Sequence, residues 1–205
     1  MSTVAIVDYG MGNLDSICRA VKECGREPIV SDQASDLARA ERIILPGVGA
    51  FPDAMRHLRE RGLDVVLNEQ VRRQGVPFLG ICLGAQLMAE RGWESGQTAG
   101  LGWIEGEVTR LERVEPDERI PHVGWNEVQP LRAHPVFSAA EPPRDFYFVH
   151  SYHFRPRRSE DALARTPYCG GFISAVARDN MVGVQFHPEK SQKAGFAFLR
   201  RFLTW

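Results

Sequence analysis

Residues 78–86 read Phe78-Leu79-Gly80-Ile81-Cys82-Leu83-Gly84-Ala85-Gln86, an apolar run that passes directly into a helical pattern with a cysteine at the junction. Glycines lie two residues before and two residues after the cysteine, which is the spacing of a nucleophile elbow. That turn is so tight that flanking side chains would collide, and Gly80 and Gly84 leave the room it needs. We therefore expect Cys82 on the carboxyl edge of a parallel sheet, where open α/β folds place their sites.

Cys82 would also lie at a helix N-terminus, where the partial positive charge of the helix favours the thiolate. The alternative interpretation is a buried structural cysteine between two packing glycines. Other segments of the chain are needed to choose between the two.

The first half of the chain alternates short apolar runs with helical spacing, and the strand–helix order repeats four times. This order is typical of a parallel sheet with helices on both faces. We predict an α/β fold with an open, mostly parallel, doubly wound sheet and right-handed crossovers. The expected strands are 4–7, 28–30, 42–45 and 76–81, and the expected helices are 14–24, 31–40, a segment around Met55 and Leu58, 65–73 and 83–90.

The second half, from about residue 102, alternates apolar and polar residues roughly in twos, which indicates additional antiparallel or mixed strands. These strands either extend the first sheet or form a small second sheet. The closing segment 191–204 predicts a helix, and no repeat or linker divides the chain, so we expect one domain over residues 1–205. The expected strands of this half are 103–111, 146–149, 172–177 and 182–186.

The composition is that of a globular protein of 205 residues, with 43% hydrophobic and 25% charged residues. The 26 acidic and 25 basic residues nearly cancel, and the formal net charge is −1, so we expect no nucleic-acid or membrane partner. Without a secretory signal or a long apolar run, the cytoplasm is the expected location. The four cysteines lack CxxC spacing and neighbouring histidines, and we expect no disulfide framework, metal or cofactor.

A second informative segment, Val184-Gln185-Phe186-His187-Pro188-Glu189, follows an apolar strand. His187 can act as general base toward Cys82, and Glu189 can orient the imidazole and stabilise its charged form. The alternative for His187 is a structural histidine. His150, in Val149-His150-Ser151-Tyr152, has no such partner arrangement and either lines the site or is structural.

An acyl-transfer site also needs hydrogen-bond donors for the oxyanion that develops in the transition state. The backbone N–H of Leu83, next to Cys82, is one candidate. The turn Pro46-Gly47-Val48-Gly49 offers a second donor through Val48 or Gly49, because glycines allow backbone amides to point into a cleft. The alternative for this turn is an ordinary strand-to-helix connection.

Taken together, Gly80-Ile81-Cys82-Leu83-Gly84 and Phe186-His187-Pro188-Glu189 resemble the class I (triad) glutamine amidotransferases. Ala85 departs from that family, which usually has Met there. Further blocks in matching order resemble one branch of the family, the glutaminase subunits of imidazole glycerol phosphate synthase. Paralogues that supply ammonia to another synthase, such as one for surface-sugar amidation, remain the alternative. The blocks are 8–14, 45–51, 121–126, 148–152 and 187–191.

The resemblance implies that Cys82 attacks the side-chain amide of glutamine, with His187 and Glu189 completing a catalytic triad. Ammonia leaves, and water then releases glutamate from a thioester on Cys82. A cysteine hydrolase acting on peptides would instead need an open groove, and a silent scaffolding subunit would not need an intact triad. The residues that would hold glutamine by this resemblance are Gly49, Gln86, Ser151 and Tyr152.

The resemblance further implies a heterodimer in histidine biosynthesis, in which a (βα)8-barrel cyclase subunit receives the ammonia. Asn13, Trp125, Tyr147 and Lys190 would face this partner. Trp125 suits an interface anchor, because tryptophan is enriched at binding hot spots, and the alternative is a half-buried core residue. Lys190 either forms an interfacial ion pair or is a solvated surface lysine. We also predict that one peptide of residues 46–49 rotates to complete the oxyanion hole only when the partner has bound its substrate.

Overall fold

Two β-sheets organise the chain in the computed structural model, which describes residues 3–137 and 142–205. Within these residues, the larger sheet has nine strands in the order β2-β1-β3-β4-β13-β12-β11-β8-β9, and the smaller sheet has four in the order β10-β7-β5-β6. The strands of the larger sheet are β1 (Thr3–Val7), β2 (Glu27–Ser31), β3 (Arg42–Gly47), β4 (Phe78–Cys82), β8 (His122–Pro130), β9 (Arg144–His150), β11 (Ala162–Thr166), β12 (Phe172–Arg178) and β13 (Met181–Val184). The strands of the smaller sheet are β5 (Ala89–Gly92), β6 (Thr98–Ala99), β7 (Ile104–Arg110) and β10 (Tyr152–Pro156).

Parallel pairing runs through β2, β1, β3 and β4, as predicted from the first half of the chain, and continues to β13 from the second half. From β12 to β9 the strands join in antiparallel pairs. The predicted α/β fold class is therefore confirmed. Both arrangements that were left open for the second half occur, because some of its strands extend the large sheet and others form the small one.

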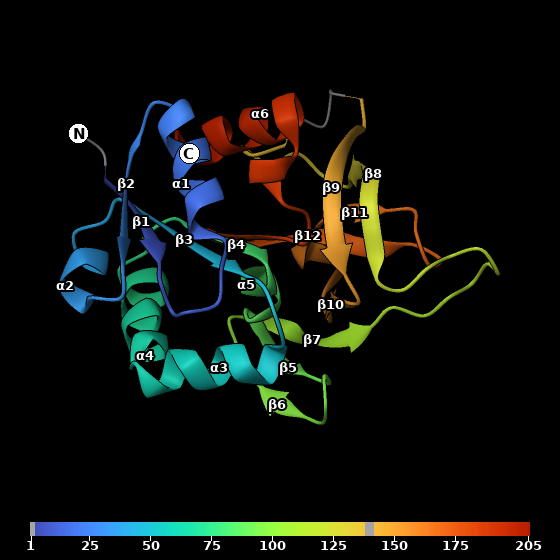
Figure 1. The fold of residues 1–205 in the computed structure, drawn as a ribbon, viewed down its shortest axis with the longest axis horizontal. Helices are drawn as coiled ribbons and strands as arrows, with labels where there is room; N and C mark the ends of the chain where they lie inside the picture. The colour runs from blue at the N-terminus through green and yellow to red at the C-terminus, as the bar shows by residue number, and fades with distance from the viewer. Residues whose placement is uncertain (1–2, 138–141) are drawn as a thin grey trace.

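Helices cover both faces of the parallel part of the large sheet (Figure 1). Along β1, Val4 and Ile6 pack in one hydrophobic cluster with residues of α1 and α6, and Ala5 and Val7 pack in the other with residues of α3 and α4. This explains the unbroken apolar run of that strand, since both of its faces are buried. The helical segments are α1 (Leu14–Glu23), α2 (Ala34–Leu37), α3 (Phe51–Glu60), α4 (Leu63–Leu67), the π-helix η1 (Asn68–Arg73), α5 (Leu83–Gln86), η2 (Ser159–Asp161), η3 (Pro188–Lys190) and α6 (Gln192–Phe202).

The predicted helix over 83–90 is wrong beyond its first turn, because α5 ends there and β5 begins three residues later. Backbone carbonyls that would continue the helix accept hydrogen bonds from a distant segment instead. Leu101 N–H donates to Leu87 O at 2.8 Å, and Trp103 N–H donates to Met88 O at 2.9 Å. The expected helix is buried up to its last residue, so no polar face marks where it ends.

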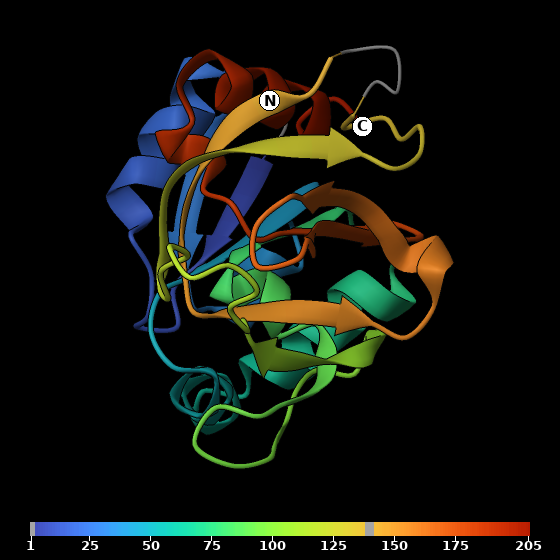
Figure 2. The same cartoon turned by 90° about the vertical axis from the view of Figure 1, so that its right-hand side faces the viewer.

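The carboxyl ends of β3, β4 and β13 lie at one edge of the large sheet. Gly47 is opposite Cys82 in the β3–β4 register, and Val184 is opposite Ile81 in the β4–β13 register. In the view of Figure 2, β8 and β9 run side by side next to α6, and β7 and β10 lie farther from α6. Among the described residues, no helix is long and apolar enough to cross a membrane.

Candidate active site

Cys82 ends β4 and directly precedes α5, with a backbone φ of 53° and ψ of −110°. A positive φ is strained for a residue with a side chain, and such strain concentrates at functional sites. The neighbouring glycines make the turn possible: a Cβ on Gly84 would overlap the Leu45 carbonyl oxygen, and one on Gly80 would lie 2.7 Å from the Gly84 carbonyl oxygen. The predicted elbow is therefore present, and Cys82 is buried in it, with 7% exposure.

His187 and Glu189 follow β13, at the turn into η3. His187 Nδ1 lies 2.8 Å from Glu189 Oε1, and both side chains are 4% exposed. Because β13 is the parallel neighbour of β4, the residues that follow these two strands leave the sheet at the same edge. The fold thus brings together two segments that are far apart in the sequence.

The turn that carries His187 is fixed to β9 through Ser191. His187 N–H donates to Tyr147 O at 2.9 Å. Ser191 Oγ donates to His187 O at 2.6 Å and accepts from Tyr147 N–H at 3.0 Å. Ser191 is buried, and its hydrogen bonds tie the backbone of His187 to β9, a contact that the sequence reasoning did not foresee.

Opposing effects set the charge of the imidazole. Burial lowers the pKa of His187, but the hydrogen bonding and charge of Cys82 and Glu189 outweigh burial and raise the pKa to about 10. Among the described residues, the Nε2 atom of His187 is buried and has no partner at hydrogen-bond geometry. At neutral pH this arrangement favours the charged imidazolium form of His187.

Gln185 is a site residue that the sequence reasoning missed. Its Nε2 donates to Cys82 Sγ at 3.6 Å, and its Oε1 accepts from Gln86 Nε2 at 3.0 Å. Gln86 Nε2 also donates to Tyr152 O at 2.9 Å, so the Gln86 amide nitrogen is engaged within the wall of the site. The signal for Gln185 is its place two residues before His187, since such residues share one side of an extended chain.

The predicted oxyanion donors lie beside the elbow. Leu83 is the first residue of α5, and its N–H therefore has no intrahelical acceptor. Val48 N–H, on the neighbouring turn, donates to Met11 O at 3.2 Å and is engaged in this structure. Gly49 has a φ of +119°, and a Cβ there would lie 2.6 Å from Met11 Cε.

Tyr9 is a second buried group at this edge that the sequence did not signal. A Cβ on Gly47 would overlap Tyr9 Oη and would lie 2.9 Å from Gly84 N, which puts the hydroxyl against the elbow. The Oη atom finds no hydrogen-bond partner among the residues that the structure describes. Burial, and then the charge of Cys82, raise the pKa of Tyr9 well above its ordinary value, so the phenol stays neutral.

Three of the four residues expected to face a partner form one cluster. The rings of Trp125 and Tyr147 have centroids 6.1 Å apart, and Lys190 Nζ lies 5.8 Å from the Tyr147 centroid. Trp125 is 47% exposed. Asn13, the fourth, caps α1 by accepting from Ser16 N–H at 3.4 Å.

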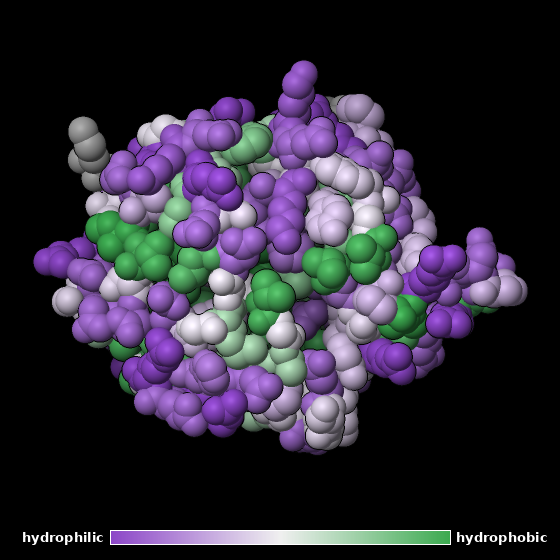
Figure 3. Space-filling view, viewed as in Figure 1, coloured by the Kyte–Doolittle hydropathy of each residue, from purple (hydrophilic) through white to green (hydrophobic). Residues whose placement is uncertain are grey.

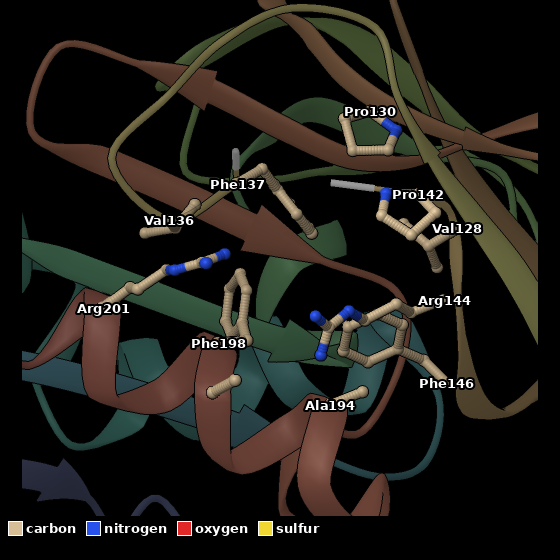
Figure 4. A pocket seen from close by; sticks show the side chains of 11 residues that line it. Val128, Pro130, Val136, Phe137, Pro142, Arg144, Phe146, Ala194, Phe198 and Arg201 are labelled. Carbon is tan, nitrogen blue, oxygen red and sulfur yellow. The ribbon is translucent and has the colours of Figure 1, made fainter. Parts of the chain in front are cut away.

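A separate pocket lies between α6 and the β8–β9 pair (Figure 4). Phe198 and Arg201 line it from α6, and Val128 and Phe146 line it from the strands. None of the expected catalytic or substrate-binding residues contributes to its lining. The pocket is therefore no part of the site at the elbow.

Comparison with known proteins agrees with this geometry. The glutamine amidotransferase class-I family matches residues 5–204. A crystal structure of a glutamine amidotransferase shares the fold with a TM-score of 0.77 at 20% identity, over 98% of this chain and 97% of that chain. The chain belongs to the class-I glutamine amidotransferases, and it is an enzyme of that class.

The relatives narrow the assignment within that class. Imidazole glycerol phosphate synthase subunit HisH of Caulobacter vibrioides is 44% identical over 211 residues, covering 100% of this chain and 99% of its own length. The protein of the same name from Cereibacter sphaeroides is 46% identical over 206 residues, covering 98% and 97%. Within its family, the chain belongs with the HisH subunits of imidazole glycerol phosphate synthase.

Proposed function

We propose that this chain is the glutaminase subunit of imidazole glycerol phosphate synthase, acting in histidine biosynthesis, and that Cys82 is its nucleophile. One observation carries the proposal: a strained, buried cysteine lies beside His187, whose pKa is raised to about 10 by Cys82 and Glu189 against the effect of burial. A structural cysteine would have no need of this charged neighbourhood.

The reaction proceeds in two steps on Cys82. The thiolate attacks the side-chain amide carbon of glutamine, and the carbonyl electrons move to oxygen. His187 gives its proton to the amide nitrogen, the C–N bond breaks, and ammonia leaves a γ-glutamyl thioester. His187 then takes a proton from water, the hydroxide attacks the thioester, and the C–S bond breaks. The new γ-carboxyl group releases its proton to water, glutamate leaves, and the thiolate and imidazolium are restored.

We further propose that the oxyanion hole is completed only when the partner subunit has bound its own substrate. Leu83 N–H supplies one donor, but Val48 N–H donates to Met11 O in the described structure. Rotation of the peptide between Gly47 and Val48 would free the second donor, and the positive φ of Gly49 is compatible with such a change. Loss of one oxyanion donor costs about 10²–10³ in kcat, so glutamine would be hydrolysed slowly until the partner binds its own substrate.

The ammonia acceptor in this proposal is a (βα)8-barrel cyclase subunit docked on the outer face of β8 and β9. Val123, Trp125 and Val149 are exposed there. In Figure 3, apolar residues form a band across the face of the molecule, part of it over these two strands. Exposed apolar groups of this kind mark interaction surfaces, and docking would keep the ammonia from protonation in water.

We also propose that residues 1–205 act as one amidotransferase domain in the cytoplasm. The four cysteines of the described chain are free, which suits a reducing compartment. The family match over residues 5–204 supports a single unit.

The test is a glutaminase assay of the purified chain mixed with the cyclase subunit, with and without the nucleotide-like substrate of that subunit. The proposal expects glutamate release that rises when this substrate is added, and no release by Cys82→Ala. Equal glutamate release by the parent and Cys82→Ala complexes would remove Cys82 as the nucleophile.

A further inference from the structure

Two buried histidines outside the triad form a cross-strand pair on the inner face of β8 and β9. His122 is opposite His150 in the strand register, and their nitrogens Nδ1 and Nε2 are 3.0 Å apart. The residues are 3% and 6% exposed. Tyr168 stacks on the His122 ring with centroids 4.1 Å apart. The reaction proposed above uses neither imidazole.

A backbone acceptor fixes the tautomers of this pair. His150 Nδ1 lies 2.9 Å from Tyr152 O, which can only accept, so Nδ1 carries the hydrogen. His150 Nε2 must then accept from His122 Nδ1, and His122 Nε2 accepts from Asn126 Nδ2 at 3.3 Å. Burial lowers the pKa of His122 to about 4 and that of His150 to about 3. Both rings are therefore neutral at physiological pH, and each donor in the chain meets an acceptor.

The Tyr152 carbonyl connects these histidine hydrogen bonds to the catalytic site. It accepts from His150 on one side and from Gln86 Nε2 on the other. Gln86 leads on to Cys82 through Gln185. The corner between β9 and β10 is thus held from the sheet interior and from the elbow at once.

We propose that His122 and His150 are positioning residues for glutamine, because their hydrogen-bonded pair fixes the Tyr152 carbonyl and with it the backbone of Ser151 and Tyr152. The inference rests on the proposed function, together with the expectation from the family resemblance that Ser151 and Tyr152 hold glutamine. The histidines act through Tyr152 and touch no reacting atom, so their loss weakens glutamine binding more than the chemical step.

Two substitutions at position 150 separate the hydrogen bond from the bulk of the ring. His150→Asn keeps a donor near the position of Nδ1, and His150→Leu keeps an apolar side chain of similar bulk without a donor. In the complex with the cyclase subunit, KM for glutamine rises about tenfold in His150→Leu, the size of one lost hydrogen bond. In His150→Asn it stays within about threefold of the parent value, and kcat stays within about threefold in both.

His153→Leu is the matched control. His153 is a neighbouring imidazole that packs on Phe172 at 5.8 Å, as His150 does at 5.0 Å, but it lies outside the chain of hydrogen bonds to Tyr152. Its KM for glutamine stays at the parent value. The glutamine Kd, measured by calorimetry in a Cys82→Ala background, shows the same order of variants and needs no turnover.

An unchanged KM and Kd in His150→Leu, or an equal rise in the Leu and Asn variants, would overturn the proposal. If His150→Leu shows no cooperative unfolding transition, the same KM and Kd comparison is made with His122→Asn and His122→Leu. His122→Asn keeps the donor to His150, and His122→Leu removes it. If the glutamine Kd values of the parent and the variants follow the expected order but the parent complex releases no glutamate, the proposed function is contradicted and the positioning role is still supported.

Discussion

Tyr9 brings a hydroxyl into the buried edge beside Cys82, and within residues 3–137 and 142–205 this hydroxyl has no hydrogen-bond partner. A buried hydroxyl without a partner costs about 1–3 kcal/mol. Tyr9→Phe keeps the ring and removes this cost, so the variant is expected to gain about 1 kcal/mol, or roughly 2–4 °C in Tm. Thermal unfolding of the parent and the variant checks this, and a lower Tm in Tyr9→Phe would show that the hydroxyl is bonded in solution.

Glu189 is expected to set the alkaline limit of activity. Burial lowers the pKa of His187, and Cys82 and Glu189 raise it to about 10, so the imidazolium persists until the pH rises through that value. Glu189→Gln removes a negative charge that raises the pKa of His187, and the lost charged hydrogen bond stabilises the imidazolium by about 1.5–3 kcal/mol. The alkaline limb of kcat/KM should therefore move down by about one to two pH units. A limb at the parent pH in Glu189→Gln would contradict the assigned role.

Single residues were predictable where their role follows from local sequence. The glycine spacing around Cys82 and the adjacency of His187 and Glu189 are visible in two short segments. Gln185 was missed although its spacing from His187 was a local signal. Ser191 and the hydroxyl of Tyr9 were missed because each is placed by a strand or turn far away in the chain. Their roles depend on register, which no local pattern reveals.

At the scale of elements, the parallel strands were predictable because both of their faces are buried, and their helices were predictable because one apolar side of each is buried. The one-turn length of α5 was not, since segment 87–90 gives its carbonyls to segment 100–104. The strands β8, β10 and β11 were also missed, as their side chains are mixed in polarity. Their pairing partners, rather than their own composition, determine them.

The turn after β3 is the element expected to control turnover. Gly49 has a φ of +119°, a conformation that a β-branched residue resists. Gly49→Val should abolish the stimulation of glutaminase by the substrate of the cyclase subunit, while the complex still forms in size-exclusion chromatography.

Gly25→Val provides the control for backbone strain alone, because Gly25 has a φ of +79° and nothing within 4 Å of its added Cβ. It is expected to lose stability but to keep stimulation. Stimulated turnover that survives in Gly49→Val would mean that the peptide rotation is not needed.

At the scale of the whole molecule, the buried histidines make the fold sensitive to acid. The ordinary pKa is 6.5, and the folded values are about 4 for His122 and about 3 for His150. Above pH 6.5 both histidines are neutral in the folded and the unfolded chain, and the free energy of unfolding has its full value. As the pH falls below 6.5, the histidines are protonated in the unfolded chain but stay neutral in the folded chain. Stability is therefore lost from pH 6.5 down through the folded pKa values, by up to about 1.4 kcal/mol per pH unit for each group.

His150→Asn isolates this effect, since it cannot titrate and keeps the donor to Tyr152. Its free energy of unfolding, from urea melts at pH 6.5, 5.5 and 4.5 (values chosen to span the window), should fall less steeply than that of the parent by roughly 1 kcal/mol per pH unit. Parallel pH profiles in the two proteins would exclude His150 as a source of acid sensitivity.

The central claim is that catalysis passes through a covalent intermediate on Cys82. The most direct measurement is mass spectrometry of the complex after an acid quench during glutamine turnover, with peptides mapped for a γ-glutamyl adduct. The account predicts the adduct on the peptide that contains Cys82 and none on those with Cys18, Cys24 or Cys169, which are also free. An adduct on one of those three, or sustained glutamate release by Cys82→Ala, would contradict it.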